Sequence, residues 1–165
     1  MIHIHGSYLS QPTRAVLWAL AMKGVPHQMH RISPREFTEA ESDAFLLRFP
    51  MGIMPAMEDF SVNVASPSSS SSSDENPSGK VSEVTPLRLT ESHAILTYLA
   101  EKYQWADWYP LGQSTEDVRR RAVVNQWLHW HHGNLRPATE LCFRPLMLAQ
   151  TGMAKRAQAG VPLIE

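Results

Sequence analysis

Six consecutive serines at positions 68–73 lie near the middle of the chain and constrain its fold more than any other feature. Between Ser66 and Gly79 the only apolar residues are prolines. Such a stretch cannot bury enough apolar surface to offset the entropy lost on ordering, so we predict a disordered Ser-rich insertion at about 62–85. Any fold of this chain must therefore accommodate a long insertion between two ordered parts.

The sequence on both sides of the insertion predicts alternating strands and helices. Residues 2–5 alternate Ile and His, which is typical of a strand with one buried face. Apolar residues at helical spacing and flanking Pro and Gly predict the remaining elements. These are helices at 13–23, 36–49 and 91–104, and strands at 27–32, 54–60 and 86–90. This order is that of an α/β thioredoxin-like N-terminal domain, residues 1–104, with a four-stranded mixed sheet and three helices.

The remainder of the chain predicts helices only. Residues 105–113 are rich in Trp, Pro and Gly and read as a linker. Ser114 and the acidic residues after it are typical of a helix start, and a long helix is expected from there to about Leu135. We therefore expect residues 114–165 to form a partial, apparently truncated all-α C-terminal domain. Its exposed faces should be unusually apolar.

Charge and hydropathy argue against several classes of partner. The chain has 15 Lys and Arg against 16 Asp and Glu, so it lacks the basic excess of a nucleic-acid binder. The longest apolar run, 15–22, is far shorter than the ~20 residues that span a bilayer. The first residues do not resemble a signal peptide. We therefore expect a cytoplasmic protein that binds neither nucleic acid nor membrane.

Cysteine and histidine give little support for a metal site. The single cysteine, Cys142, excludes an intramolecular disulfide and a multi-cysteine metal site, and we expect it to be a small buried residue. His129 and His132 have a spacing that zinc ligands can have, but no cysteine lies nearby. We therefore expect no metal.

Three segments together carry a family resemblance: Tyr8–Arg14, Pro50–Met57 and Leu89–Leu99. They resemble the glutathione-binding half of the cytosolic glutathione S-transferases, and Leu-Ser-Gln-Pro at 9–12 is most similar to the theta class. The similarity covers about 1–60 and 86–148. It implies glutathione as co-substrate, a homodimer, and detoxification by transfer of the glutathione thiolate to small hydrophobic electrophiles, including halide displacement or peroxide reduction. Relatives are longer, so the resemblance also implies a shortened helical domain.

Ser10 is the candidate catalytic residue. It lies just before a helix N-terminus, where unpaired N–H groups and the helix dipole favour negative charge. The resemblance implies that its hydroxyl donates a hydrogen bond to the glutathione sulfur and so stabilises the thiolate, which is the nucleophile. The alternative is that Ser10 only caps the helix, since serine is a preferred N-cap residue. Ser7 and Tyr8 are local competitors for the thiolate contact.

The other two segments are candidates for holding the tripeptide. The resemblance implies that Met54–Pro55 is a cis bond and that the Met54 backbone pairs with the cysteinyl backbone of glutathione. It also implies that Ser92 binds the γ-glutamyl carboxylate and Glu91 the ammonium. The alternatives are a trans proline that opens an edge strand and a plain capping cluster.

The glycyl end of glutathione lacks its usual ligands in this sequence. Ile53 stands beside the expected cis-proline, where theta-like relatives often carry a basic residue, and residues 38–41 contain no histidine. Glutathione's glycyl carboxylate would then be held weakly, or by Arg14 or Arg48.

The helical part offers a candidate acceptor pocket, made of Trp127, Trp130 and His131, with Met147 beside it. The alternative is that the tryptophans pack between domains. Three rival functions stay open. They are a non-catalytic interaction module with this fold, a truncated product that folds poorly alone, and a glutathione-dependent isomerase.

Overall fold

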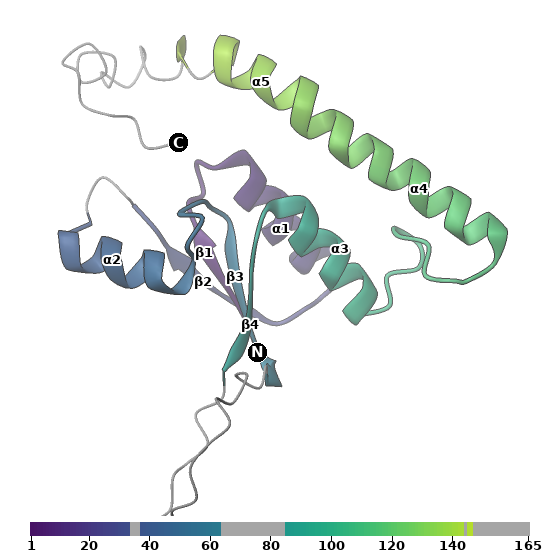
Figure 1. Ribbon diagram of the computed structural model, residues 1–165, viewed down its shortest axis with the longest axis horizontal. Coiled ribbons are helices and arrows are strands. Elements are labelled where there is room, and N and C mark those ends of the chain that lie inside the picture. Colours follow the sequence, from purple (N-terminus) through teal and green to yellow (C-terminus); the bar gives the residue numbers. More distant parts are fainter. Residues whose placement is uncertain (34–36, 64–84, 144, 147–165) are drawn as a thin grey trace, which may run out of the picture. The chain divides into compact units, whose positions relative to one another are not determined.

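The computed structural model describes residues 1–33, 37–63, 85–143 and 145–146 (Figure 1). Its strands are β1 (Ile2–Gly6), β2 (His27–Arg31), β3 (Ala56–Asn63) and β4 (Pro86–Thr90). Its α-helices are α1 (Gln11–Met22), α2 (Glu39–Arg48), α3 (Ser92–Lys102), α4 (Thr115–Trp130) and the short α5 (Arg136–Ala138).

The four strands form one mixed sheet in the order β2-β1-β3-β4. β1 pairs in parallel with β2, and α1 supplies the crossover between them. β3 pairs antiparallel with both β1 and β4. This arrangement confirms the predicted thioredoxin-like domain with its four-stranded mixed sheet and three helices.

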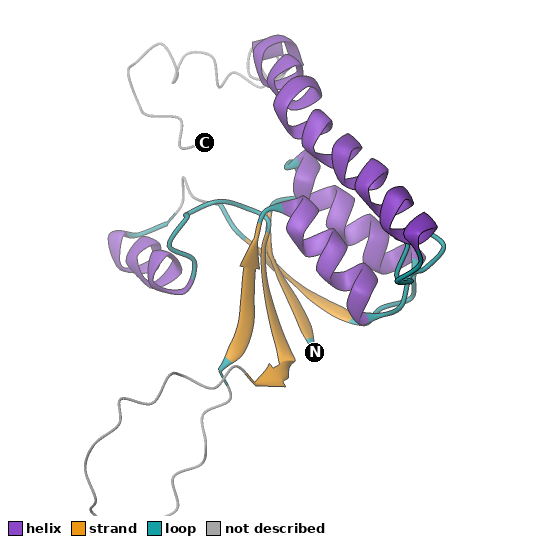
Figure 2. Cartoon of the chain, turned by 45° about the vertical axis from the view of Figure 1, so that its right-hand side comes forward, coloured by secondary structure: helices purple, strands orange, loops and turns teal. Residues whose placement is uncertain are grey.

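The alternating Ile and His residues of β1 separate the two faces of the sheet. Ile2 and Ile4 are fully buried. Gly6 is on the same face, and a Cβ there would lie 2.6 Å from Oγ1 of Thr13 in α1, so β1 and α1 approach closely. His5 is on the other face, where its ring lies 5.4 Å from the ring of Phe49, just after α2. α1 and α2 accordingly lie on opposite sides of the sheet (Figure 2).

Each of the first two helices begins at a residue whose side chain caps it. Ser10 caps α1, and proline occupies the first turn, where the missing N–H costs nothing. Thr38 caps α2 in a full capping box, because Glu41 bonds back to the Thr38 backbone N–H at 2.8 Å. On the sheet side of α2, Phe45 and Phe49 form a buried cluster with Ile32 and Ala56. The capping box at Thr38 explains why α2 begins at Glu39 and not at the predicted residue 36.

The serine tract lies outside the described residues. β3 continues through Val62 and Asn63, into the stretch 62–85 predicted as an insertion, and Asn63 pairs with Pro86 of β4. The register shifts between Asp59 and Asn63. The sheet is therefore paired up to the two residues that flank residues 64–85.

The chain divides into two compact units, Met1–Leu96 and Thr97–Glu165. The division falls within α3.

In the second unit, the segment before α4 is tied to that helix. Arg121 Nη1 donates to the carbonyl oxygens of Pro110, at 2.7 Å, and Gly112, at 3.1 Å. Tyr109 Oη donates to Asn125 Oδ1 at 3.2 Å. Trp105 is buried, with its ring edge-on to Trp108 at 5.7 Å. The linker 105–113 is therefore held to α4 by hydrogen bonds.

α4 ends at Trp130, before the predicted Leu135, and the chain continues in the wider π-helical turns His131–Leu135 and Thr139–Phe143. None of the residues of α4 is buried. Its exposed apolar side chains include Val118, Val123, Trp127 and Trp130. Cys142 is also exposed, so the expectation of a buried cysteine was wrong. The reason is that the turn carrying it lies in a helical stretch with little packed against it.

No helix in the described part of the chain is both long and apolar enough to span a membrane. Among the same residues, no group of three or more His, Cys, Asp or Glu side chains is placed to hold a metal ion.

Candidate functional site

Strand register brings the three predicted site segments to one end of the sheet. His5, at the end of β1, is opposite Ala56, the first residue of β3, and Ala56 is opposite Thr90, the last residue of β4. The loop to Ser10, the segment before Ala56 and the turn after Thr90 therefore all leave the sheet at the same end. Segments far apart in the sequence thus meet as the resemblance implied.

Ser10 is half-buried at the start of α1. Its backbone is extended, and its Oγ accepts a hydrogen bond from the Thr13 N–H at 3.3 Å. A serine hydroxyl that accepts this bond still has its own O–H to donate. Capping and donation to a sulfur, which the sequence presents as alternatives, are therefore compatible at this one atom.

The loop before Ser10 is fixed mainly through backbone groups. Arg14 Nη1 donates to the carbonyl oxygens of Tyr8, at 2.9 Å, and Leu9, at 3.2 Å. The Ser10 N–H donates to the Ser7 carbonyl at 2.9 Å, and Ser7 Oγ accepts from the Leu9 N–H at 3.2 Å. The Tyr8 side chain is 60% exposed. Ser7 and Tyr8 lie close to Ser10 in the chain, so the assignment of the thiolate donor among them stays a prediction.

The Met54–Pro55 peptide bond is cis. Pro55 is fully buried, whereas Ile53 and Met54 are half-buried. Paired β3 begins only at Ala56, so Met54 lies beyond the ladder at the open end of the sheet. An extended ligand backbone can pair there as an added strand.

The turn that leads to Met54 depends on Gly52. Its φ is +62°, a left-handed conformation that residues with a Cβ adopt at a cost, and a Cβ there would lie 3.0 Å from Leu46. Thr90 Oγ1 donates to Met51 Sδ at 3.1 Å, which joins this turn to the end of β4. Two of the predicted site segments are therefore in direct contact.

Glu91 forms the turn between β4 and α3. Its φ is +68°, which is uncommon for a residue with a side chain. Ser92 is the first residue of α3, and the Ile95 N–H donates to the Glu91 carbonyl at 2.9 Å. Strained backbone is often retained where it positions functional groups. Here it places Glu91 and the N-terminus of α3 at the same end of the sheet as Ser10.

Sequence reasoning missed a polar cluster on the face of the sheet that α2 covers. Glu58 on β3 is 2% exposed, and Oε2 accepts from His5 Nε2 at 3.0 Å. The same oxygen accepts from Arg48 Nη1 at 3.2 Å, while Oε1 accepts from Arg88 Nε at 2.9 Å. Two histidines on neighbouring strands, His3 and His30, complete the cluster with a 3.0 Å contact between Nδ1 and Nε2. The signal available in the sequence was histidine at alternate positions of a buried strand.

The electrostatics of this cluster shift three pKa values downward. Burial lowers the pKa of His5, although hydrogen bonding to Glu58 acts against this. Burial and the neighbouring His30 lower the pKa of His3. Burial acts to raise the pKa of Glu58, but its hydrogen bonds from Arg88 and His5 and the charge of Arg48 outweigh burial and lower it. Glu58 is therefore a carboxylate, and burial favours the neutral form of both histidines.

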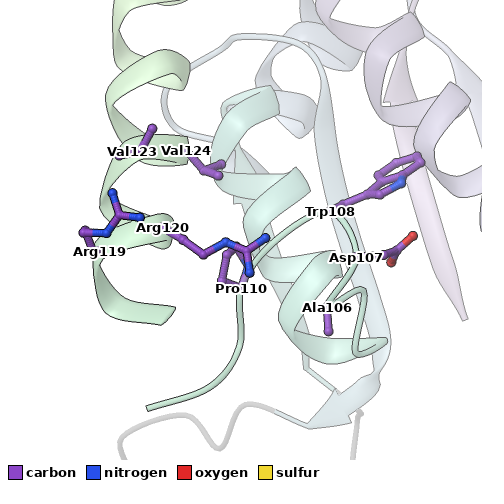
Figure 3. A pocket seen from close by; sticks show the side chains of 8 residues that line it. All are labelled: Ala106, Asp107, Trp108, Pro110, Arg119, Arg120, Val123 and Val124. Atoms are coloured by element: carbon purple, nitrogen blue, oxygen red, sulfur yellow. The ribbon is translucent and has the colours of Figure 1, made fainter. Parts of the chain in front are cut away.

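The candidate acceptor residues lie at the end of α4, which carries Trp127 and Trp130, and at His131 in the turn after it. Trp127 and Trp130 stack edge-on at 5.6 Å and are 58% and 47% exposed. A cavity of about 280 Å³ lies at the start of α4, and its lining includes none of the three predicted residues (Figure 3). It is lined by Ala106, Asp107, Trp108, Pro110, Arg119, Arg120, Val123 and Val124. Met147 lies outside the described residues.

Known proteins share both the sequence and the fold of this chain. The rat (Rattus norvegicus) glutathione S-transferase theta-1 is 33% identical over 147 residues, which make up 88% of this chain and 47% of the rat protein. Glutathione S-transferase T3 of Arabidopsis thaliana is 46% identical over 68 residues, 39% of this chain and 11% of that protein. The chain thus spans less than half the length of these curated relatives.

Two solved human structures have the same fold. The apo form of glutathione-S-transferase T1-1 matches with a TM-score of 0.56 and 28% identity, covering 82% of this chain and 44% of the human one. Glutathione transferase theta-2, in a complex with glutathione and an unknown ligand, matches with a TM-score of 0.54 and 26% identity, covering 81% of this chain and 42% of that one.

The match to a family model overlaps all three segments of the candidate site. The model described as Glutathione S-transferase, N-terminal domain, matches residues 10–102, which is more than half of the 165 residues. This stretch begins at Ser10 and contains the cis-proline and the turn at Glu91. Together with the theta relatives and the thioredoxin-like sheet, it shows that the chain belongs to the glutathione S-transferase family.

Proposed function

We propose that this chain binds glutathione at the end of the sheet formed by Ser10, Met54 and Glu91, and activates its thiol. The Ser10 hydroxyl donates to the sulfur, while the N-terminal N–H groups of α1 favour the negative charge that forms there. The observation that carries the proposal is that Ser10 Oγ accepts from Thr13 at the helix start and so keeps its proton for a ligand.

The rest of the tripeptide is held by backbone and helix-end contacts. The Met54 N–H and C=O pair with the cysteinyl backbone, next to Ile53 and Pro55. Ser92 and the N–H groups at the start of α3 bind the γ-glutamyl carboxylate, and Glu91 binds the ammonium. Solved relatives support this ligand, because the human theta-2 structure and a Pseudomonas fluorescens family member contain glutathione.

The activity that follows is glutathione transfer to a small hydrophobic electrophile in the cytoplasm, by a homodimer. In halide displacement the thiolate attacks carbon, the S–C bond forms as the carbon–halogen bond breaks, and the conjugate and a halide ion leave. In peroxide reduction the thiolate breaks the O–O bond and releases the alcohol, and a second glutathione converts the sulfenic acid to glutathione disulfide and water. Halide displacement and peroxide reduction are the finer reactions that we propose from the theta resemblance. Trp127, Trp130 and His131 remain the candidate contacts for the electrophile.

Thiol titration tests the proposal directly. We expect the thiolate absorbance of bound glutathione to show a pKa below that of free glutathione. In Ser10→Ala the pKa should return by roughly 1–2 units, since a hydrogen bond to a charged group is worth about 1.5–3 kcal/mol. Ser10→Thr keeps the hydroxyl and should retain most of the shift.

A matched control separates the loss of the hydroxyl from the loss of a helix cap. Ser114 caps α4 in the same way, accepting from the Asp117 N–H at 3.1 Å. Ser114→Ala therefore removes a serine cap without touching the proposed site and should leave the bound thiol pKa unchanged. A folded wild-type chain that leaves the pKa of glutathione at its free value would exclude thiol activation.

The exposed position of the candidate acceptor residues favours a second function. Trp127 and Trp130 do not line the cavity in the second unit. A chain with this arrangement can bind glutathione without turning over an electrophile, as an interaction module does. A lowered thiol pKa, together with no conjugate from alkyl halides or activated aromatic halides and no glutathione disulfide from peroxides, would favour the module.

A further inference from the structure

The Glu58 carboxylate links four elements of the first unit. It lies on β3 and bonds His5 of β1, Arg48 of α2 and Arg88 of β4. The Glu58 side chain is 3% exposed, whereas that of Arg48 is 40% exposed. A buried carboxylate is stable only while its partners remain in place. The position of α2's last turn is therefore coupled to the charge of a buried group.

Each partner of Glu58 comes shortly before a segment of the proposed glutathione site. Arg48 is the last residue of α2 and precedes the turn that leads to Met54. Arg88 is directly opposite Glu58 in the β4 register and precedes Thr90 and Glu91. His5 precedes Gly6 and the loop to Ser10. One carboxylate thus fixes the starting points of all three segments.

We propose that Glu58 and Arg48 are positioning residues for the glutathione site, and that mild acid weakens glutathione binding by disturbing their ion pair. This inference rests on the proposed function. It concerns how the site is held, and neither residue needs to touch the ligand.

The charged and titratable groups around Glu58 explain why acid acts at Arg48. His5 and Arg48 both donate to Oε2 of Glu58, and Arg48 is the more distant of the two, at 3.2 Å. A proton on His5 therefore adds a second positive charge beside Arg48. The His5 ring also stacks on His30 at 4.7 Å, and His30 contacts His3. The positive charge of the N-terminal amine of Met1 contributes to the lowered pKa of His3. Protonation of His5 or His3 therefore adds positive charge near Glu58. Arg88 bonds the other oxygen from the neighbouring strand, which leaves Arg48 as the partner that is displaced.

The test uses S-methylglutathione, because its sulfur cannot ionise. Its carboxylates and ammonium keep their charges between about pH 5 and pH 7.5, so any pH dependence of its affinity belongs to the protein. Calorimetry gives the affinity at each pH, and circular dichroism confirms that the chain is folded there. We expect wild-type affinity to fall about fivefold from pH 7.5 to pH 5.

Variants of Arg48 assign that effect. Arg48→Met should bind about fivefold more weakly at pH 7.5, with a nearly flat pH profile, and Arg48→Lys should recover much of both properties. Arg31→Met removes an exposed arginine from β2 and serves as the matched control, with wild-type behaviour expected. Glu58→Gln, if it folds, should resemble Arg48→Met. An Arg48→Met chain that binds like Arg31→Met would overturn the inference while leaving the proposed function intact.

A second ligand distinguishes positioning from direct contact with the glycyl carboxylate. S-methyl-γ-glutamylcysteine lacks the glycine. If Arg48 acts through Glu58, the loss in Arg48→Met should be the same for both ligands. A loss seen only with the full tripeptide would make Arg48 a direct ligand and refute the positioning role. A wild-type chain that binds neither compound would exclude the proposed function, and the inference with it.

Discussion

At the scale of single residues, Ser10 shows how one hydroxyl can serve both the fold and the chemistry. As an acceptor it caps α1, and as a donor it remains available to a ligand. The sequence predicted the cap from a serine placed before a helix, and the family resemblance implied the donor role. It could not show that they coexist, since that depends on the direction of one hydrogen bond.

The buried hydroxyl of Thr13, close to the same site, should lower the stability of the fold. Its side chain is fully buried, and within the described part of the chain its Oγ1 has no hydrogen-bond partner. A buried hydroxyl without a partner is unfavourable, and valine has nearly the same shape. Thr13→Val should therefore raise the free energy of unfolding in urea by about 1 kcal/mol.

Two comparisons make the Thr13 measurement decisive. The Thr13 backbone N–H still caps on Ser10 in the valine variant, so glutathione binding should not change. Thr13→Ala removes the same hydroxyl but leaves a cavity, and it should destabilise the chain. A Thr13→Val variant less stable than wild type would mean that the hydroxyl has a partner that the structure does not show.

At the scale of elements, α2 depends on its first and last turns. A helix of ten residues is only marginally stable in water on its own, and Phe45 is the only buried residue of α2. The capping box at Thr38 and the ion pair from Arg48 hold its two ends. α2 should therefore open locally before the sheet does.

Removal of the cap should make this visible. Thr38→Ala is expected to cost about 1 kcal/mol, because the Glu41 N–H loses its acceptor and the Thr38 hydroxyl no longer bonds the Glu41 carboxylate. Hydrogen exchange should then accelerate by roughly fivefold in α2 amides while those of β1 and β3 change less. Thr38→Ser keeps the acceptor and should behave like wild type. Uniform acceleration across the whole first unit would show that α2 does not open on its own.

Elements were predicted well where short-range signals decide them. Ser10 and Pro12 indicate the start of α1, and alternating Ile and His predict β1. The Glu58 cluster could not be predicted in the same way, because His5 and Glu58 are 53 residues apart and meet only through strand register. The prediction that Cys142 is buried was wrong for a related reason. Burial of a residue on a helical turn depends on what packs against that turn, which the local sequence does not specify.

At the scale of the whole molecule, stability should depend on the histidines of the sheet. His3 and His5 have a lowered pKa when the chain is folded, so the unfolded chain binds protons more readily. Stability is therefore retained above the unfolded value of about 6.5 and lost as pH falls from there through the folded values. We expect the free energy of unfolding in urea to decline steadily below pH 6.5.

Substitution of histidine checks this assignment. His5→Gln should reduce the slope of stability against pH below 6.5, although the variant itself can be less stable at neutral pH. His129 is exposed on α4, and His129→Gln should leave the slope as it is in wild type. If both variants keep the wild-type slope, other groups determine the acid sensitivity.

The β3–β4 pair separates the two ends of the sheet. β3 has eight residues, so Asn63 lies about 23 Å along the strand from Ala56, where the candidate site begins. The pairing of Asn63 with Pro86 holds the two strands together before the serine-rich stretch starts. In evolutionary terms, a lineage can lengthen, shorten or rewrite residues 64–85 under little constraint from the chemistry. The serine tract can therefore change in sequence and length independently of the candidate glutathione site.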